Sequence, residues 1–358
     1  MRVRSYITHK LCESYADCQD RFSINEDKRI IAISDGMSQS IFPDYWAEIL
    51  SDQYANEGHC NEEDRIRLCS NWLKRVEEYR DEQVRLGNNP WKLNNFLAAH
   101  KGAGATICGI RFENATDWKG DVLGDSCIVE VNRENDDIII LSSEEKAFDY
   151  YPDYYDSFPE KKGRGLIKSF SGEIGSNKLL LLVSDPFSEF LDKNKNDCKD
   201  YIQQILQLTS HSDFCTLVDN WREKGMHNDD STLCIIEFDN SLEFNIEYQD
   251  DISFLIQQEN EEAESIVTKE GTNPVIDKFG QKQDDDFEKK VIEKSKTTQL
   301  DKLENFYNKV VKELDILIAP KKRRRLPWSN GDNKICKQEI RELKNKLIKE
   351  YEILTTLD

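Results

Sequence analysis

Short aliphatic runs, several of them bordered by an aspartate, are the feature that most restricts the fold of this 358-residue chain. Their β-branched and aliphatic residues, with Gly, Asp or Asn at the ends, favour strands over helices. Six runs fit this description: 29–34, 105–112, 126–131, 137–141, 178–184 and 231–238. Helical patterns come between them in blocks, and strict strand–helix alternation is missing. We therefore expect the α+β class, with sheets flanked by helices.

Apolar residues spaced by three and four positions predict the helices between these strands. The expected apolar faces are Phe42, Trp46, Ile49 and Leu50; Ile66, Cys69, Leu73 and Val76; Ile202, Ile205 and Leu206; and Phe214, Leu217, Val218 and Trp221. Ser212 is the expected N-cap of the last helix, and Gly225 is its expected C-terminal stop.

A change of composition divides the chain into a folded domain over 1–255, an acidic flexible linker over 256–286 and a helical appendage over 287–358. The linker is polar and poor in aromatic residues, so it cannot bury enough apolar surface to offset its ordering entropy. In the appendage, apolar residues recur at heptad-like steps on two segments separated by Pro327 and Gly331. This pattern predicts a C-terminal helical hairpin or coiled coil, which could self-associate, dock on the folded domain or recruit substrate.

The net charge of −20, from 49 basic and 69 acidic residues, argues against nucleic-acid binding by the protein as a whole. One basic cluster, Lys321–Arg325, could bind nucleic acid, anionic lipid or an acidic partner, or it could be a solvated loop between the two helices. We favour the solvated loop and do not expect a nucleic-acid partner.

The chain has neither a membrane-helix pattern nor a secretory signal pattern. No apolar run approaches the roughly 20 residues that a membrane helix requires. The first residues are basic but have no apolar stretch behind them, so a cytoplasmic location is expected. The ten cysteines form no C-x-x-C pair, which favours buried free thiols over zinc ligands or disulfides.

Five aspartates stand at the edges of the predicted strands: Asp20, Asp35, Asp125, Asp185 and Asp229. Taken singly, each could be a turn former or a helix cap. If they converge, their charges repel one another unless a cation lies between them. Carboxylates without paired His or Cys ligands suit Mg²⁺ or Mn²⁺. A pair of such ions would favour hydrolysis of phosphate esters.

The order and spacing of six short motifs resemble those of the metal-dependent type 2C (PPM) serine/threonine protein phosphatases, in particular their divergent bacterial branch. The motifs are Gln19-Asp20, Ser34-Asp35-Gly36, Gly104-Ala105-Thr106, Gly124-Asp125-Ser126, Ser184-Asp185 and Asp229-Asp230-Ser231-Thr232, preceded by Thr8-His9. The resemblance covers about residues 5–240. It implies a four-layer α-β-β-α sandwich of two antiparallel sheets with helices outside.

The resemblance also implies a metal centre of two Mn²⁺ or Mg²⁺ ions and a weaker third ion. Asp35 would bridge the two ions, and the Gly36 carbonyl would help to hold the second. Asp185 and Asp229 would complete the first site, Asp20 would support the second, and Asp125 corresponds to the third. Gly104-Ala105-Thr106 would be a structural element near the cleft.

Several positions depart from the family pattern. Gln19 is neutral where many relatives have Glu, and Met37–Ser40 lacks the further glycines and the histidine that some members have there. Pro186 replaces a glycine and is compatible with the first turn of a helix. The arginine that binds substrate phosphate in many relatives has no clear match, and Lys10 and Arg21 are the nearby candidates.

Two histidines lie near these motifs. His9 could donate a proton to the leaving alkoxide, a role that suits its near-neutral pKa. Alternatively, it could bond a neighbouring loop and organise the cleft, and this second interpretation is favoured. His227 is expected to be a solvated loop residue.

The resemblance implies hydrolysis of phosphoserine and phosphothreonine in proteins by a metal-activated water. The expected partners are phosphorylated proteins, namely a cognate Ser/Thr kinase or its targets. The alternative is a catalytically weak pseudophosphatase that acts as a phosphoprotein-binding or regulatory module. That alternative rests on the missing arginine and the altered loop after Asp35.

Overall fold

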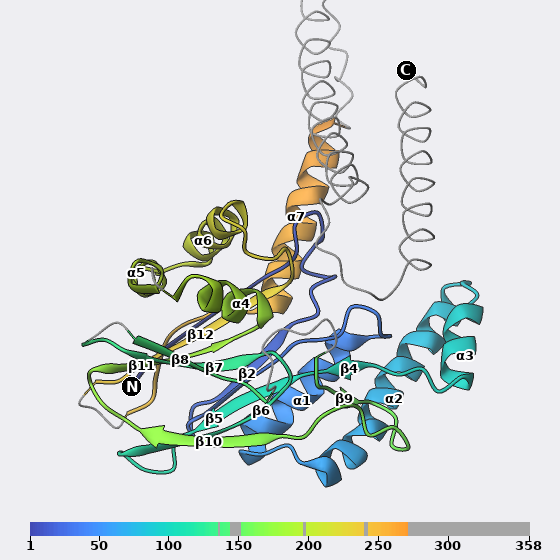
Figure 1. Ribbon diagram of the computed structural model, residues 1–358. Coiled ribbons are helices and arrows are strands. Elements are labelled where there is room, and N and C mark those ends of the chain that lie inside the picture. The colour runs from blue at the N-terminus through green and yellow to red at the C-terminus, as the bar shows by residue number, and fades with distance from the viewer. Residues whose placement is uncertain (135–136, 144–151, 196–197, 240–242, 271–358) are drawn as a thin grey trace, which may run out of the picture. The chain divides into compact units, whose positions relative to one another are not determined.

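The computed structural model describes residues 1–134, 137–143, 152–195, 198–239 and 243–270 (Figure 1). The chain divides into two compact units, 1–272 and 273–358. The expected helical appendage over 287–358, with its heptad pattern and the basic cluster 321–325, lies outside the described residues, as does the linker beyond residue 270.

Two sheets form the centre of the first unit. The larger has the order β13-β1-β12-β11-β7-β8 and is antiparallel except for the parallel pair β1 and β13. Its strands are β1 (Arg2–Thr8), β7 (Cys127–Asn132), β8 (Asp137–Leu141), β11 (Lys178–Val183), β12 (Ser231–Glu237) and β13 (Asn245–Gln249).

The smaller sheet is antiparallel throughout and has the order β10-β6-β5-β3-β2. Its strands are β2 (Arg21–Asn25), β3 (Ile30–Ser34), β5 (Ile107–Arg111), β6 (Asp117–Leu123) and β10 (Lys168–Glu173). A separate short pair joins β4 (Gly104–Ala105) to β9 (Tyr155–Asp156).

The two sheets share one apolar core, to which β3 contributes Ile31 and Ile33 and β11 contributes Leu180 and Leu182. The alternate residues of β11 lie in a different core, against the helices of the larger sheet. Because successive side chains of a strand point to opposite faces, a strand that is buried on both faces must be apolar throughout. The run LLLLV therefore identifies β11 as a central strand.

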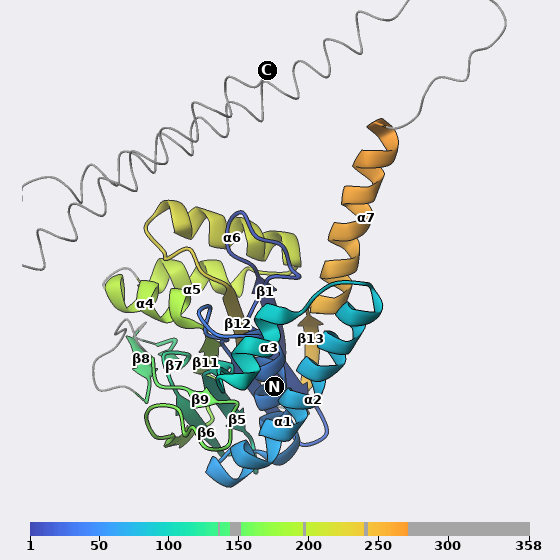
Figure 2. The same cartoon turned by 90° about the vertical axis from the view of Figure 1, so that its right-hand side faces the viewer.

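Helices cover the outer faces of both sheets (Figures 1 and 2). Three precede β4: α1 (Pro43–Glu57) and α2 (Glu62–Arg85), which pack with residues of the smaller sheet, and α3 (Trp91–Ala98). The larger sheet packs against α4 (Asp185–Lys193), α5 (Cys198–Leu206) and α6 (His211–Glu223). Among the described residues, none of the helices combines the length and apolar character needed to cross a bilayer.

The predicted α+β class is confirmed, and each of the six predicted strands is present. The run 105–112 is divided, because Thr106 separates β4 from β5. The prediction missed β1, β2, β6, β9, β10 and β13. The last helix ends as predicted before Gly225, whose φ is +102°.

Two details of the helix prediction are wrong. The N-cap of α6 is Ser210, whose hydroxyl accepts a hydrogen bond from the Asp213 N–H, and not Ser212, which lies inside the helix. Ile66 is 47% exposed, because α2 turns Arg65, Leu68 and Trp72 towards the core instead.

Helix α7 (Ile252–Glu270) occupies the first part of the segment that was expected to be a flexible linker. Leu255 is buried with Ile7, Tyr15 and Cys18. One turn later, the Glu259 carboxylate accepts a hydrogen bond of 2.9 Å from the Tyr15 N–H. These contacts stabilise the helix against the entropy cost of ordering it, a cost that the composition of the segment suggested would not be offset. The linker prediction therefore does not hold over 256–270.

Candidate metal centre

Four of the five predicted aspartates line one cleft of about 650 Å³: Asp35, Asp125, Asp185 and Asp229. Asp35 follows β3 of the smaller sheet, whereas Asp185 follows β11 and Asp229 precedes β12 of the larger one. The cleft therefore lies where the ends of both sheets meet. Asp20 does not line it and is only 1% exposed.

Thr106 fixes the backbone of Asp35. Its hydroxyl accepts a 3.0 Å hydrogen bond from the Asp35 N–H, and its own N–H donates a 2.9 Å bond to the Asp35 carbonyl. The next residue, Gly36, leaves no room for a side chain, because a Cβ there would lie 2.8 Å from Pro43 Cβ and 2.9 Å from the Gln19 carbonyl oxygen. The carboxylate thus stands on a rigid strand end.

Asp20 is oriented by Thr232, a residue of β12. The Thr232 hydroxyl donates a 2.7 Å hydrogen bond to Asp20 Oδ2, and the Thr232 N–H donates a 2.8 Å bond to the Ser184 hydroxyl. Three of the sequence motifs are therefore linked by hydrogen bonds behind the cleft.

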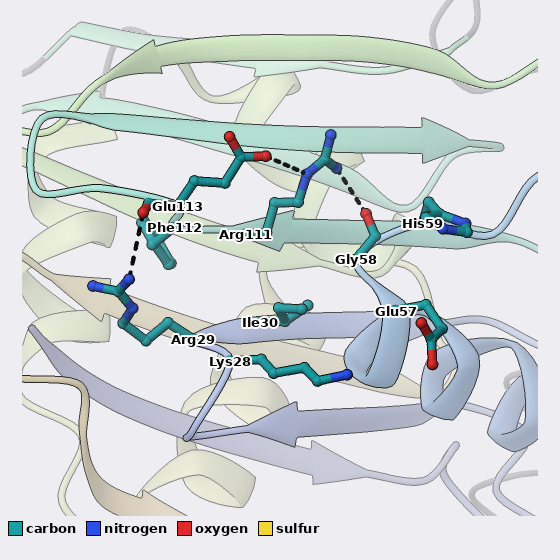
Figure 3. Close-up of a pocket in the computed structure, with 9 residues that line it drawn as sticks. All are labelled: Lys28, Arg29, Ile30, Glu57, Gly58, His59, Arg111, Phe112 and Glu113. Carbon is teal, nitrogen blue, oxygen red and sulfur yellow. Dashed lines mark hydrogen bonds and ion pairs between the residues drawn. The ribbon is translucent and has the colours of Figure 1, made fainter.

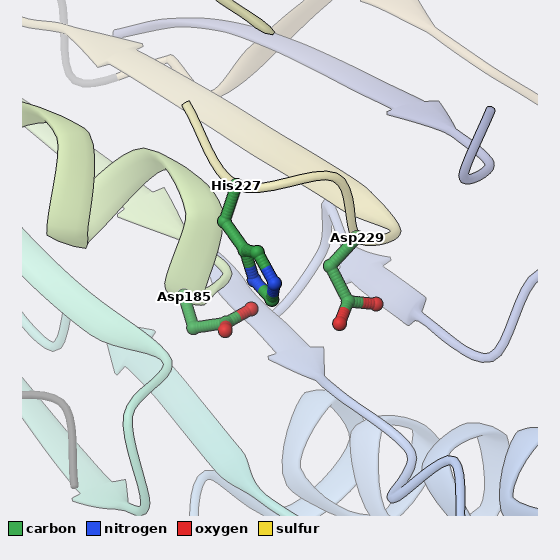
Figure 4. A group of neighbouring side chains, drawn as sticks. All are labelled: Asp185, His227 and Asp229. Carbon is green, nitrogen blue, oxygen red and sulfur yellow. The ribbon is translucent and has the colours of Figure 1, made fainter. Parts of the chain in front are cut away.

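His227 joins Asp185 and Asp229 in a group whose ligand atoms lie within 4.8 Å of one another (Figure 4). Asp185 begins α4, where Pro186 occupies the first turn as expected and the helix dipole favours a negative charge. The ring of His227 is exposed, which agrees with the prediction of a solvated loop residue, but it also offers a nitrogen ligand that the sequence interpretation did not include.

The carboxylates raise one another's pKa. Burial is the largest cause for Asp35, followed by the charges of Asp20, Asp185, Asp125 and Asp229. Burial, Asp125, Asp229 and Asp20 similarly raise the pKa of Asp185. For Asp20, burial and Asp230 raise the pKa to about 7. Such a cluster is destabilising without a cation.

Whether the site fits a metal can be judged from the hydrogen bonding of two carboxylate oxygen atoms in the cluster. Asp20 Oδ1 and Asp185 Oδ1 are buried and have no hydrogen-bond partner among the described residues. A buried carboxylate oxygen without a partner costs free energy that a coordinated cation would offset. The oxygen donors of the cleft suit the hard cations Mg²⁺ and Mn²⁺.

Lys10 places a positive charge beside Asp229 and Asp230. Its Nζ lies 3.0 Å from Asp229 Oδ1 and 3.9 Å from Asp230 Oδ2, and it donates a 2.8 Å hydrogen bond to the Ser38 hydroxyl. Burial lowers the pKa of Lys10, but Asp229 and Asp230 outweigh it and raise the pKa above its usual value. Lys10 therefore neutralises aspartates beside the cleft.

Asp230, which belongs to a motif but was not among the predicted site residues, holds the loop before Asp20. It is 2% exposed and accepts hydrogen bonds from the backbone N–H groups of Lys10, at 3.0 Å, and Gln19, at 2.7 Å. The sequence contains a signal of this role. Asp229 and Asp230 are adjacent, so only one of their carboxyl groups can face the cleft and the other is left to bond the protein.

Arg21 and His9 do not line the cleft. The Arg21 guanidinium donates 2.7 Å hydrogen bonds to the carbonyls of Cys18 and Asp20 and lies 3.3 Å from Asp44. These contacts position the backbone of Asp20 rather than a substrate. His9 donates from Nδ1 to the Lys10 carbonyl, packs its ring 4.6 Å from that of Tyr15 and lies 3.9 Å from Glu259. These contacts match the loop-organising interpretation.

Of the fourteen described residues that line the cleft, Lys193 is the only lysine or arginine. Its Nζ lies 2.8 Å from Glu189 Oε1 on the same helix, and its side chain is 59% exposed. The residues Met37–Gln39, where the chain departs from the family pattern, form part of the same wall. Sequence reasoning did not identify Lys193, because a lysine on a helix face is usually solvated.

A second hollow, of about 450 Å³, lies beside the end of α1 and the start of β3 (Figure 3). Its cationic groups are engaged with the protein. Arg111 bonds the Gly58 carbonyl, at 2.8 Å, and Asp121, at 2.7 Å, and Arg29 reaches the Glu113 carbonyl, at 3.5 Å. We interpret this arginine cluster as a structural link between α1 and β5.

No family model and no curated protein matches the chain. The chain is similar to several solved structures of serine/threonine phosphatases. A bacterial serine phosphatase is 12% identical and has a TM-score of 0.45, with 67% of this chain and 99% of that chain covered. The serine/threonine phosphatase of S. agalactiae is 14% identical, with a TM-score of 0.42 and coverages of 66% and 99%.

The serine/threonine phosphatase Stp1 from Staphylococcus aureus is also 14% identical, with a TM-score of 0.42 and coverages of 66% and 95%. At such identities, the side chains of the cleft carry the functional conclusion.

Proposed function

We propose that this chain is a phosphoric monoester hydrolase that removes phosphate from phosphoserine and phosphothreonine in proteins, with Mn²⁺ or Mg²⁺ as cofactor. The observation that carries the proposal is the convergence of Asp35, Asp185 and Asp229 on one cleft from both sheets, with two orphaned carboxylate oxygens in the same cluster. The two sheets with helices on their outer faces support the four-layer α-β-β-α sandwich that accompanies this function.

The proposed ligands follow the positions in the cleft. Asp35 would bridge two ions and the Gly36 carbonyl would assist at the second, while Asp185 and Asp229 would complete the first site. Asp20 would support the second site, and Asp125 would hold a third, weaker ion. Two bound ions would supply an acidified water as nucleophile and positive charge against the phosphate.

The residues of the chain prepare this reaction in three ways. Thr106 and Gly36 hold Asp35 at a rigid strand end, which keeps its two oxygens fixed. Thr232 directs Asp20 Oδ2, so its other oxygen remains for a ligand. Lys10 offsets the charge of Asp229 and ties it to Ser38 in the loop after Asp35. A substrate phosphate entering beside Lys10 would meet a positive charge.

A second candidate function is a phosphoprotein-binding module with little turnover. The pairing of Lys193 with Glu189 favours it, because the one lysine among the described residues that line the cleft is then partly neutralised. The free cysteines, most of them buried, support a reducing, cytoplasmic location for either function. The remaining proposals are self-association through the C-terminal helices and a cognate kinase or its targets as partners.

Hydrolysis of p-nitrophenyl phosphate and of a phosphothreonine peptide by the full chain with Mn²⁺ tests the enzyme. Calorimetric titration with Mn²⁺ distinguishes the two candidates. Binding of two or more ions with turnover supports the phosphatase, whereas the same binding without turnover on any phosphopeptide supports the binding module.

A further inference from the structure

Cys215, in the first turns of α6, differs from the other cysteines in the described part of the chain. Seven of the nine are buried, Cys12 is exposed, and Cys215 is partly exposed. Burial raises the pKa of the enclosed thiols, for example that of Cys69 to about 11 and that of Cys127 to about 12. Thiols in such surroundings are unreactive.

Three polar groups surround the Cys215 sulfur. His211 Nε2 lies 3.3 Å from Sγ, one turn earlier on the same helix. The Thr8 hydroxyl, at the end of β1, lies 3.6 Å away, and the Tyr15 hydroxyl lies 3.7 Å away. The neutral thiol donates to the Thr8 hydroxyl, whereas a charged sulfur would accept hydrogen bonds from His211 Nε2 and the Tyr15 hydroxyl, and such bonds favour the charged form.

Asp250 orients the imidazole. His211 Nδ1 donates a 2.9 Å hydrogen bond to Asp250 Oδ2, because a carboxylate can only accept. Asp250 is 4% exposed and also accepts bonds from the Ile7 N–H and the Tyr248 hydroxyl, both at 2.9 Å. The proton on Nδ1 leaves Nε2 to face both the Tyr15 hydroxyl, at 2.6 Å, and the sulfur, at 3.3 Å. A nucleophile, a base and an orienting carboxylate thus stand in sequence.

The charges around the sulfur also favour the thiolate form of Cys215. Burial lowers the pKa of His211, but the hydrogen bond to Asp250 outweighs it and raises the pKa to about 9. Burial raises the pKa of Cys215, but the hydrogen bond and charge of His211 outweigh it and lower the pKa below that of an ordinary thiol. The titratable and charged groups around this site are Tyr15, His211, Arg222, Tyr248 and Asp250.

We propose that Cys215 is a redox-modification site whose thiolate reacts with a hydroperoxide, with His211 as proton donor and Asp250 as positioning residue. The sulfur attacks the outer peroxide oxygen, so an S–O bond forms and the O–O bond breaks. The sulfur is oxidised by two electrons to a sulfenic acid. The peroxide is reduced to an alkoxide or hydroxide, which takes the Nε2 proton of the His211 imidazolium and leaves as alcohol or water.

Alkylation of the full chain by iodoacetamide, followed at each cysteine by peptide mass spectrometry between pH 5 and 10, tests the thiolate. The expected midpoint of the Cys215 profile lies below that of Cys12, which is the exposed comparison within the same molecule. His211→Gln should shift the Cys215 midpoint upward, and Asp250→Asn should shift it in the same direction. The control Cys12→Ser should leave it unchanged.

A Cys215 profile that rises together with that of Cys12, or above it, overturns the proposal, and this comparison within the native chain depends on no variant. The reaction itself is tested by treatment with hydrogen peroxide followed by dimedone. A dimedone adduct at Cys215 and not at Cys12 is expected, and its absence at Cys215 overturns the peroxide step. Neither measurement uses phosphatase activity, so the outcome is independent of the proposed function.

Discussion

Lys10 and Asp229 form an ion pair of 3.0 Å beside the carboxylate cluster. Both side chains are largely shielded, since that of Lys10 is 13% exposed and that of Asp229 is 31% exposed. Lys10 therefore supplies part of the positive charge that the metal-free cluster requires, in addition to the substrate contact proposed for it.

Lys10→Met should destabilise the metal-free protein by about 1–3 kcal/mol, because it leaves buried carboxylate charge without its partner. Removal of a positive charge should also tighten Mn²⁺ binding. Denaturant unfolding with and without Mn²⁺ measures both effects. A higher KM for a phosphopeptide, with unchanged stability and metal affinity, would show instead that Lys10 serves only the substrate.

Asp185→Asn should stabilise the metal-free protein, by about 1 kcal/mol, because it removes one of several like charges that repel one another. The same variant should lose most of the thermal stabilisation that Mn²⁺ confers on the native chain, which is about 3 kcal/mol at a hundredfold excess over Kd. Calorimetric melting measures both. A variant that is less stable without metal yet equally stabilised by Mn²⁺ contradicts the metal site.

The metal-free protein should lose stability as the pH rises. Burial and neighbouring aspartates raise the folded-state pKa of Asp185 and bring that of Asp20 to about 7. Acids with raised folded-state pKa stabilise the fold fully below their unfolded pKa of about 4, and this contribution is lost as the pH rises through the folded value. Melting between pH 5 and 8 should show the decline with chelator present, and saturating Mn²⁺ should reduce it.

His9→Gln should keep phosphatase activity within about threefold, because His9 bonds the Lys10 carbonyl and packs on Tyr15 instead of lining the cleft. Loss of a general acid typically costs about 10²–10⁴-fold and removes one limb of the pH–rate profile. A kcat loss in that range, with a flattened limb, would establish His9 as the proton donor after all.

The stability of the protein should depend on pH in the range in which His211 titrates. A Cys215→Ser background removes the titration of the thiol, so the dependence is best measured there. The hydrogen bond to Asp250 raises the folded-state pKa of His211, so its contribution is complete below the unfolded pKa of about 6.5. It is lost as the pH rises through the raised value, which is about 9 in the native chain. Asp250→Asn should flatten this dependence, and an unchanged slope would contradict the pairing.

Strands β3 and β11, with the aspartates that follow them, were predictable because burial on both faces leaves an aliphatic run. β11 reads LLLLV, and β3 reads IIAIS directly before Asp35. The polar edge strands β10 and β13 were not predictable, unlike the aliphatic edge strand β8. β10 and β13 each pair with a single neighbour, and half or more of their residues are exposed, so their sequences are polar.

The site was predictable as a set of carboxylates but not as a set of contacts. Nothing local to Arg21 indicates that its guanidinium is directed to backbone carbonyls, and nothing local to Glu259 indicates that it reaches Tyr15. Both are tertiary contacts over sequence distances that no pattern encodes. His227 could have been identified, because it lies two residues before Asp229 in the same loop.

Phosphate release from a phosphothreonine peptide by the full chain is the measurement that tests the central claim most directly. The native chain and the surface control Asp81→Asn, whose side chain on α2 is 64% exposed, should turn over with Mn²⁺ and stop when a chelator is added. Asp35→Asn should lower kcat by about 10³-fold or more, because it removes the residue proposed to bridge the two ions. Activity that survives the chelator, or survives Asp35→Asn, would contradict a metal-dependent phosphatase centred on this cleft.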